Sequence, residues 1–169
     1  WRNLLSGYLK HLFASAVLAK SVTTVIVGED GVVTLAPLAA KPEQAQQQAK
    51  AQLQIVMQGL AQALKTPLPI ALSLAEEWFK RAAKDVDKEQ ENGQEDAKEN
   101  PKEHKEYSEE ALNKVYLGDE YIDGQIKKLP YLARYYPDAA SLLQQGFVEY
   151  GERLYRPFFT LIKTASVQA

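Results

Sequence analysis

The chain of 169 residues has no cysteine and only two histidines, His11 and His104. Without cysteine it can form no disulfide and offers no thiolate nucleophile or thiolate metal ligand. Neither histidine has a second ligand three or four residues away, so a histidine-based metal site is not predicted. We expect a structural or solvated role for each. There is also no apolar run of the roughly 18 residues that a membrane-spanning helix needs, and no signal peptide.

Motifs of catalysis are equally scarce. The sequence contains no Gly-x-Ser-x-Gly elbow, no P-loop and no Gly-x-Gly-x-x-Gly turn, so neither a serine hydrolase nor a nucleotide cradle is indicated. Two carboxylate pairs remain. We assign Glu76-Glu77 to a helix start and Asp119-Glu120 to a surface loop, because catalytic pairs need burial to separate their pKa values. No catalytic residue, metal ligand or cofactor is therefore predicted.

Charge is unevenly distributed along the chain. Residues 84–110 carry a net charge of −6, whereas the remainder carries +4. Order signals fade between residues 84 and 106, so we predict a flexible acidic insertion there. The rest reads as one domain over residues 1–163 with a tail at 164–169. Because no initiator Met or helix cap precedes Trp1, we expect a C-terminal fragment of a larger subunit.

Residues 22–38 predict a β-hairpin. Two β-branched runs flank Asp30-Gly31, a dipeptide typical of hairpin turns because both residues tolerate positive φ. The carboxylates Glu29 and Asp30 lie in the turn, whereas a metal-dependent hydrolase needs carboxylates on rigid strands. This hairpin is predicted to pack rather than to catalyse.

Helices dominate the remaining pattern. Apolar residues recur at helical spacing in several segments, and a short third strand is predicted at residues 69–72 before a helix capped by Ser73. Within the second helix we expect Met57, Leu60 and Leu64 on the apolar face. The predicted helices cover residues 1–19, 42–64, 73–82, 108–118, 125–136 and 137–157. The fold class is α+β, mostly helical with a small antiparallel hairpin and a short third strand.

Cations and aromatic rings alternate toward the C-terminus. Such a composition suits contact with nucleic acid or with a protein partner, although lysines on amphipathic helices also serve as a solvated face. An apolar tail follows at Phe158 and Phe159, which we assign as a candidate subunit interface. Self-association through this tail is a further hypothesis. The candidate contact residues are Lys127, Lys128, Tyr131, Arg134, Tyr135, Arg153 and Arg156.

Four stretches together carry a family resemblance. They are residues 53–82, residues 111–124 with Tyr116 and Gly118, residues 131–137, and residues 153–159. In order and spacing they resemble the C-terminal domain of the RecC family, the gamma subunit of exodeoxyribonuclease V in the bacterial RecBCD helicase-nuclease. The likeness runs from the first helix through Phe159.

The resemblance implies a degenerate restriction-endonuclease-like fold of the PD-(D/E)xK type that has lost its active site. Ala36 and Leu38 stand where active members carry an acid and a base, and Pro37 disfavours a regular strand. The domain would be non-catalytic and would support assembly of the complex and the DNA strand-separation path. Its implied partners are a RecB-like beta subunit, a RecD-like alpha subunit and DNA, with no membrane, in the bacterial cytoplasm.

Two other functions stay open. One is a nuclease domain whose metal ligands lie outside this chain, and divalent-metal-stimulated cleavage would identify it. The other is a helical protein-interaction adaptor unrelated to DNA repair, and a failure to associate with either subunit would favour it.

Overall fold

The computed structural model describes residues 2–29, 31–79, 112–118, 121 and 123–168. They group into two compact units: Trp1–Thr66 with Glu152–Ala169 form the first, and Pro67–Gly151 form the second. The predicted acidic insertion at 84–106 lies outside the described residues. Whether residues 1–163 behave as one domain stays a prediction.

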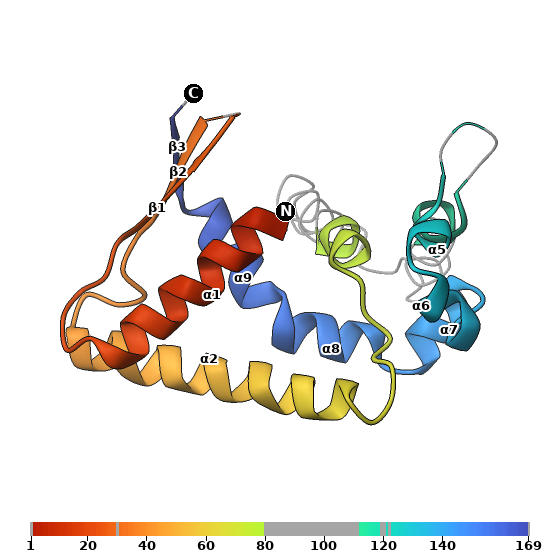
Figure 1. Cartoon of the computed structure of the whole chain (residues 1–169), viewed down its shortest axis with the longest axis horizontal. Helices are drawn as coiled ribbons and strands as arrows, with labels where there is room; N and C mark the ends of the chain where they lie inside the picture. The colour runs from red at the N-terminus through yellow and green to blue at the C-terminus, as the bar shows by residue number, and fades with distance from the viewer. Residues whose placement is uncertain (1, 30, 80–111, 119–120, 122, 169) are drawn as a thin grey trace, which may run out of the picture. The chain divides into compact units, whose positions relative to one another are not determined.

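Two long helices, α1 (Arg2–Val17) and α2 (Pro42–Ala63), pack against each other in the first unit (Figure 1). Helix α1 buries Tyr8, Leu12 and Ala16, which lie four residues apart on one face. The buried residues of α2 are Ala45 and Ala49. Their small side chains leave room for a close approach of the two backbones. These helices confirm the predictions for residues 1–19 and 42–64.

The link between the two helices is also polar. Gln46 Nε2 on α2 donates a hydrogen bond of 3.0 Å to the carbonyl oxygen of Ala16 near the end of α1. Helix α2 begins after Lys41 with Pro42 in its first turn, where a missing N–H costs nothing. The start of α2 is therefore set by Pro42 and its position against α1 by Gln46.

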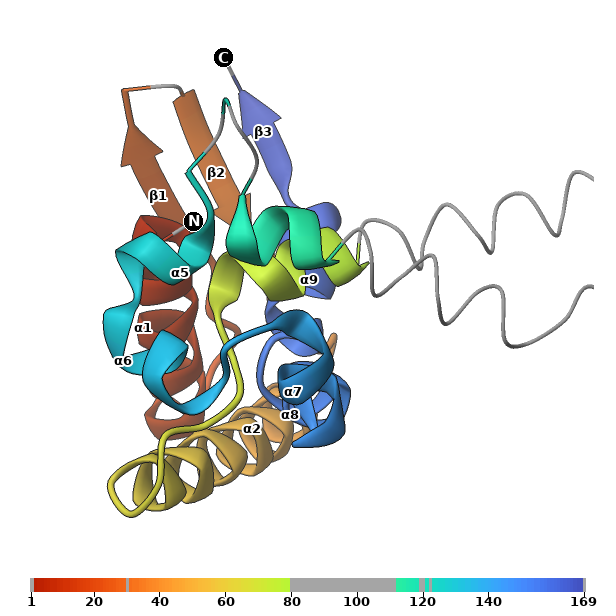
Figure 2. The ribbon, with the colours of Figure 1, turned by 90° about the vertical axis from the view of Figure 1, so that its right-hand side faces the viewer.

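A three-stranded antiparallel sheet completes the first unit. Its strands β1 (Thr24–Gly28), β2 (Gly31–Leu35) and β3 (Ser166–Gln168) lie in that order, as Figure 2 shows. The β1–β2 hairpin is confirmed, but its register places the connection one residue earlier than predicted. The last pair is Gly28 with Gly31, so the turn begins at Glu29. Gly31 has a φ of 133°, which glycine adopts without steric cost.

The third strand predicted at residues 69–72 is wrong. Pro67 and Pro69 have no N–H to offer a ladder, and the Ile70 amide bonds locally to the Leu68 carbonyl at 2.8 Å. The third strand is instead Ser166–Gln168, which pairs with β2 through Val33 and Val167 among others. The third strand therefore comes from residues 164–169, which the sequence predicted to be a tail.

Helix α9 (Arg156–Lys163) joins the first unit from the C-terminal side. Pro157 stands in its first turn, so this proline begins a helix where the sequence predicted an end. The ring of Phe158 packs against Tyr8 of α1 with a centroid distance of 5.5 Å. The described residues are mostly helical with an antiparallel hairpin, which agrees with the predicted α+β class.

The second unit is a set of short helices. Residues 72–79 and 112–117 are helical, followed by α5 (Gln125–Lys128), α6 (Pro130–Tyr135), α7 (Ala139–Gln144) and α8 (Phe147–Leu154). Of α8, residues 147–151 belong to this unit. The predictions of single helices over 125–136 and 137–157 are wrong in length. Pro130 interrupts the first, and Gly146, with a φ of 90°, interrupts the second.

Other helix ends were predicted correctly, with one shift. Gly118, with a φ of 86°, ends the helix at 112–117, and Asp138 caps α7 by accepting a 2.8 Å bond from the Ser141 amide. The helix at 72–79 begins one residue before Ser73. Its first bond runs from the Ala75 amide to the Ala71 carbonyl at 3.0 Å, so Ser73 lies in the first turn.

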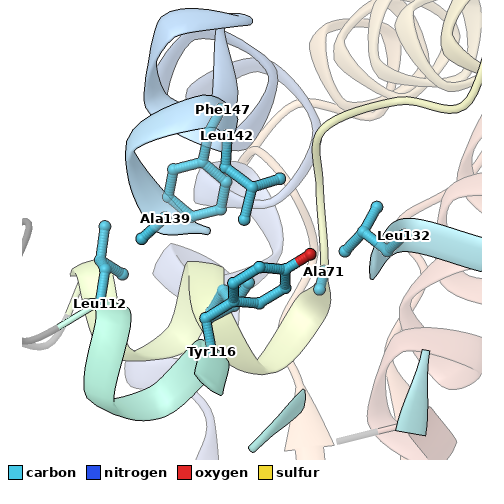
Figure 3. Close-up of a cluster of buried hydrophobic side chains, with 8 residues drawn as sticks. Ala71, Leu112, Tyr116, Leu132, Ala139, Leu142 and Phe147 are labelled. Atoms are coloured by element: carbon cyan, nitrogen blue, oxygen red, sulfur yellow. The ribbon is translucent and has the colours of Figure 1, made fainter. Parts of the chain in front are cut away.

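The core of the second unit gathers side chains from most of its helices. Figure 3 shows Tyr116 between the α7–α8 group and Leu132, with its hydroxyl directed toward Leu132. The indole of Trp78 packs edge-on against Phe147 at a centroid distance of 6.1 Å. The buried members of this core are Ala71, Leu74, Leu112, Tyr116, Leu132, Ala139, Leu142 and Phe147.

Two tyrosine hydroxyls tie three segments of the second unit together. The Tyr116 hydroxyl donates a 2.5 Å bond to the carbonyl oxygen of Tyr136, and the Tyr136 hydroxyl donates a 2.8 Å bond to the carbonyl of Pro67. Burial, followed by the negative charge of Asp138, raises the pKa of Tyr116, so it stays a donor at neutral pH. These bonds hold the loop at Pro67, the helix at 112–117 and the end of α6 in one arrangement.

We expect Tyr116→Phe to lower the free energy of unfolding by about 1–2 kcal/mol. The substitution removes the hydroxyl that donates a hydrogen bond to the Tyr136 carbonyl oxygen, and that oxygen then loses this partner. Urea unfolding followed by tryptophan fluorescence measures this. Tyr131→Phe is the matched control, since Tyr131 is 58% exposed. Equal urea midpoints for the two variants would contradict a stabilising role of the Tyr116–Tyr136 hydrogen bond.

Candidate interaction surface

Five of the predicted contact residues lie on α5 and α6 of the second unit. Lys127 and Lys128 are exposed at the end of α5, while Tyr131 and Tyr135 are each 58% exposed on α6. Tyr131, Arg134 and Tyr135 have the i, i+3, i+4 spacing of one helix face. Leu132 is fully buried, so it anchors a neighbouring side of α6 in the core. We call these five residues, Lys127, Lys128, Tyr131, Arg134 and Tyr135, the α5–α6 face.

Backbone geometry sets the place of α5. The chain returns on itself through a bridge between Gly118 and Asp123, just before α5 begins at Gln125. A Cβ on Gly124 would collide with the backbone of Leu117 and Gly118, so this position requires glycine. The short helix is thereby held against the end of the helix at 112–117.

The α5–α6 face is cationic. Lys127 Nζ donates to Asp123 Oδ1 in an ion pair whose side chains are 63% and 68% exposed. The hydrogen bond from Lys127, and then its charge, lowers the pKa of Asp123. An exposed pair of this kind contributes little to stability and is easily exchanged for another partner. Lysine and arginine beside tyrosine rings can contact phosphates and stack on bases, and arginine and tyrosine are also common in protein interfaces.

Arg153 and Arg156 do not share a unit with these residues, because the first unit resumes at Glu152. Arg156 is engaged by Glu152 through its Nε and one terminal nitrogen. The bond to Glu152 raises the pKa of Arg156. The structure thus separates the seven predicted contact residues into a group of five and a group of two.

Phe158 and Phe159, the predicted subunit interface, are buried at 0% and 7% exposure. Their rings lie 5.0 Å apart between centroids, and Phe158 packs on Tyr8. The predicted exposed apolar tail is therefore wrong, because α9 folds back and turns these rings into the core of the first unit. We leave both residues out of any proposed surface.

Exposed apolar residues occur elsewhere, on α2. Met57, Leu60 and Leu64, which the sequence predicted to face inward, are exposed by 56%, 52% and 81%. Helix α2 has 22 residues and α1 has 16, so α2 is longer by about 9 Å at 1.5 Å per residue. We call Met57, Leu60 and Leu64 the α2 ridge; helix periodicity identified the apolar stripe but not its exposure.

Only one of the two histidines and one of the two carboxylate pairs lie among the described residues. His11 is buried and bonded to Thr24, in keeping with a structural role. Glu76 and Glu77 lie on the helix at 72–79, while His104, Asp119 and Glu120 lie outside the described residues. Within the described ranges no three His, Cys, Asp or Glu side chains come together as a metal site. No helix in these ranges has the length and apolar character to cross a membrane.

Taken together, the described elements define an α+β module: a helix pair with a three-stranded sheet, and a helical unit with a basic, aromatic face. Residues 1–83 match the family model of the RecC C-terminal domain. RecC is the gamma subunit of exodeoxyribonuclease V and acts in DNA repair and recombination. No curated protein and no solved structure matched the chain.

The match ends at residue 83, so it includes α1, the hairpin, α2 and the α2 ridge but not the α5–α6 face. The two candidate surfaces are therefore supported by different kinds of observation. The α2 ridge lies inside the region that the family model describes, whereas the α5–α6 face rests on geometry and charge alone.

We expect Phe158→Ala to lower the free energy of unfolding by about 3–5 kcal/mol, because it empties a fully buried position beside Tyr8. Thermal or urea unfolding followed by circular dichroism measures the loss. Phe13→Ala, at a position 56% exposed, is the control and should change stability little. Normal stability of the Phe158 variant would contradict its assignment to the core.

Proposed function

We propose that the chain is a non-catalytic structural and interaction domain of the gamma subunit in a RecBCD-type DNA repair complex. The family match over residues 1–83 carries this proposal. The domain would support assembly with a RecB-like beta subunit and a RecD-like alpha subunit, and would line part of the path of the separated DNA strands.

A non-catalytic role agrees with the chemistry of the hairpin. Strand β2 ends at Leu35, and Ala36, Pro37 and Leu38 follow it. The resemblance places the acid and base of active nucleases at 36 and 38, and neither alanine nor leucine has an atom that binds a metal ion or moves a proton. Descent from a nuclease-like fold remains part of the proposal.

The α2 ridge supports a protein partner. Met57, Leu60 and Leu64 have the three- and four-residue spacing with which one helix packs against another. Such a row of exposed apolar side chains is typical of a surface that is covered in an assembly. We assign it to contact with the beta or the alpha subunit.

The α5–α6 face supports contact with DNA. Its cations suit phosphates, and the two tyrosines offer ring faces on which unpaired bases stack. A single strand fits this combination better than a duplex, whose bases are already stacked. Access to such a strand is what a subunit of a strand-separating complex requires.

Capture of the full chain by co-expressed beta and alpha subunits tests the assembly role. We expect Leu60→Glu combined with Leu64→Glu to reduce capture by at least tenfold, because two buried charges would then oppose the interface. Gln54→Glu combined with Gln58→Glu adds the same charge at exposed polar positions of α2 and should bind normally. Absence of capture for the wild-type chain would count against the assembly role and favour an unrelated adaptor.

Binding of fluorescent single-stranded DNA tests the α5–α6 face. We expect Tyr131→Ala and Tyr135→Ala each to weaken binding by about 1–3 kcal/mol through lost stacking, and Arg134→Ala to reduce its salt dependence. Lys10→Ala combined with Lys50→Ala, at exposed positions of α1 and α2, is the control. An equal loss in the control would indicate charge attraction without a defined site. Cleavage of the DNA with Mg²⁺ or Mn²⁺ would contradict the non-catalytic role.

A further inference from the structure

His11 links α1 to the hairpin from a fully buried position. Its side chain is 0% exposed, and Nδ1 lies 2.9 Å from the Thr24 hydroxyl at the start of β1. Helix α1 and strand β1 contact each other along this side, and a Cβ added at Gly7 would collide with the side chain of Ile26 on β1. The His11–Thr24 bond is thus a polar contact inside an otherwise apolar junction.

Two buried polar atoms next to this bond have no hydrogen-bond partner in the described structure: Nε2 of His11 and Oγ of Ser15. Ser15 is 3% exposed and follows His11 by four residues, so both side chains lie on one face of α1. An unsatisfied buried polar atom is costly, and a second N–H on a charged imidazole would increase that cost.

Protonation of His11 would therefore place a cation in the interior with one of its two N–H groups unpaired. The neighbouring elements offer no buried carboxylate among the described residues that could compensate. On α1 the nearest buried titratable group is Tyr8, whose pKa burial raises to about 12, so it stays neutral. The charged side chains of α1, α2 and α9 at Lys10, Glu43, Lys50 and Lys163 are exposed, as is Glu29 at the hairpin turn.

We propose that the His11–Thr24 pair is an acid-sensitive latch: neutral His11 holds the hairpin on α1, and protonated His11 releases it. The latch is a property of the first unit and does not depend on the proposed function. Burial lowers the pKa of His11 below its ordinary value of 6.5, which agrees with this geometry.

The direction of the pH effect follows from linkage. Because the folded pKa is lowered, the unfolded or opened state binds a proton that the latched state does not. The stabilisation is complete above pH 6.5 and is lost as the pH falls from 6.5 through the folded pKa. One such group changes the opening constant by no more than about tenfold per pH unit.

Amide hydrogen exchange of the full chain between pH 7.5 and 5 measures the release. We expect that, as the pH is lowered below 6.5, the β1–β2 amides lose protection before the amides of α2 do. The exchange rates are first corrected for the pH dependence of intrinsic exchange. His11→Gln should remove this step because glutamine does not titrate, and His104→Gln should retain it. A step that persists in His11→Gln, or is missing in the wild type, would overturn the latch.

A titration of the wild-type chain by NMR does not depend on any variant folding. The His11 ring signals should titrate with a midpoint below pH 6.5, together with the hairpin signals. An ordinary titration centred at pH 6.5 would overturn the proposal. Thr24→Val, which removes only the hydroxyl, should weaken hairpin protection already at pH 7.5, whereas Thr23→Val at an exposed position should not.

Discussion

Close packing of α1 against α2 is the contact on which the first unit depends. Ala45 and Ala49 supply the buried face of α2, and Gln46 fixes its position by bonding to the Ala16 carbonyl. Small side chains at these positions let the backbones of the two helices approach closely. Helix α2 is the longer of the two, and its last turns present the α2 ridge.

The second unit is organised by interruptions rather than by long helices. Pro130 and Gly146 divide two amphipathic segments, and the tyrosine bonds from Tyr116 and Tyr136 hold the pieces in place. Breaking the helix at Pro130 lets α6 bury Leu132 while it turns Tyr131 and Tyr135 outward. The same break therefore builds the core and exposes the α5–α6 face.

The match of residues 1–83 to the RecC C-terminal domain and the two surfaces are consistent with each other. A subunit that works inside a larger assembly needs faces for its neighbours, and the α2 ridge and the α5–α6 face differ in chemistry as contacts with protein and with DNA would. The buried His11 stands apart from both. It joins α1 to the hairpin, and in the proposed latch this contact requires His11 to be neutral.

Periodicity in the sequence was enough to predict α1, α2, the hairpin and the α+β class, because these elements depend on local spacing and turn residues. It also identified Gly118 as a helix end and Lys127, Lys128, Tyr131, Arg134 and Tyr135 as contact candidates, and the structure exposes all five. Periodicity marks which side of a helix is apolar. Whether another element covers that side is decided by the rest of the fold, so Phe158 proved buried and Leu64 exposed. Strand pairing is likewise non-local: Ser166–Gln168 became the third strand because β2 had a free edge to pair with, and no local pattern records that.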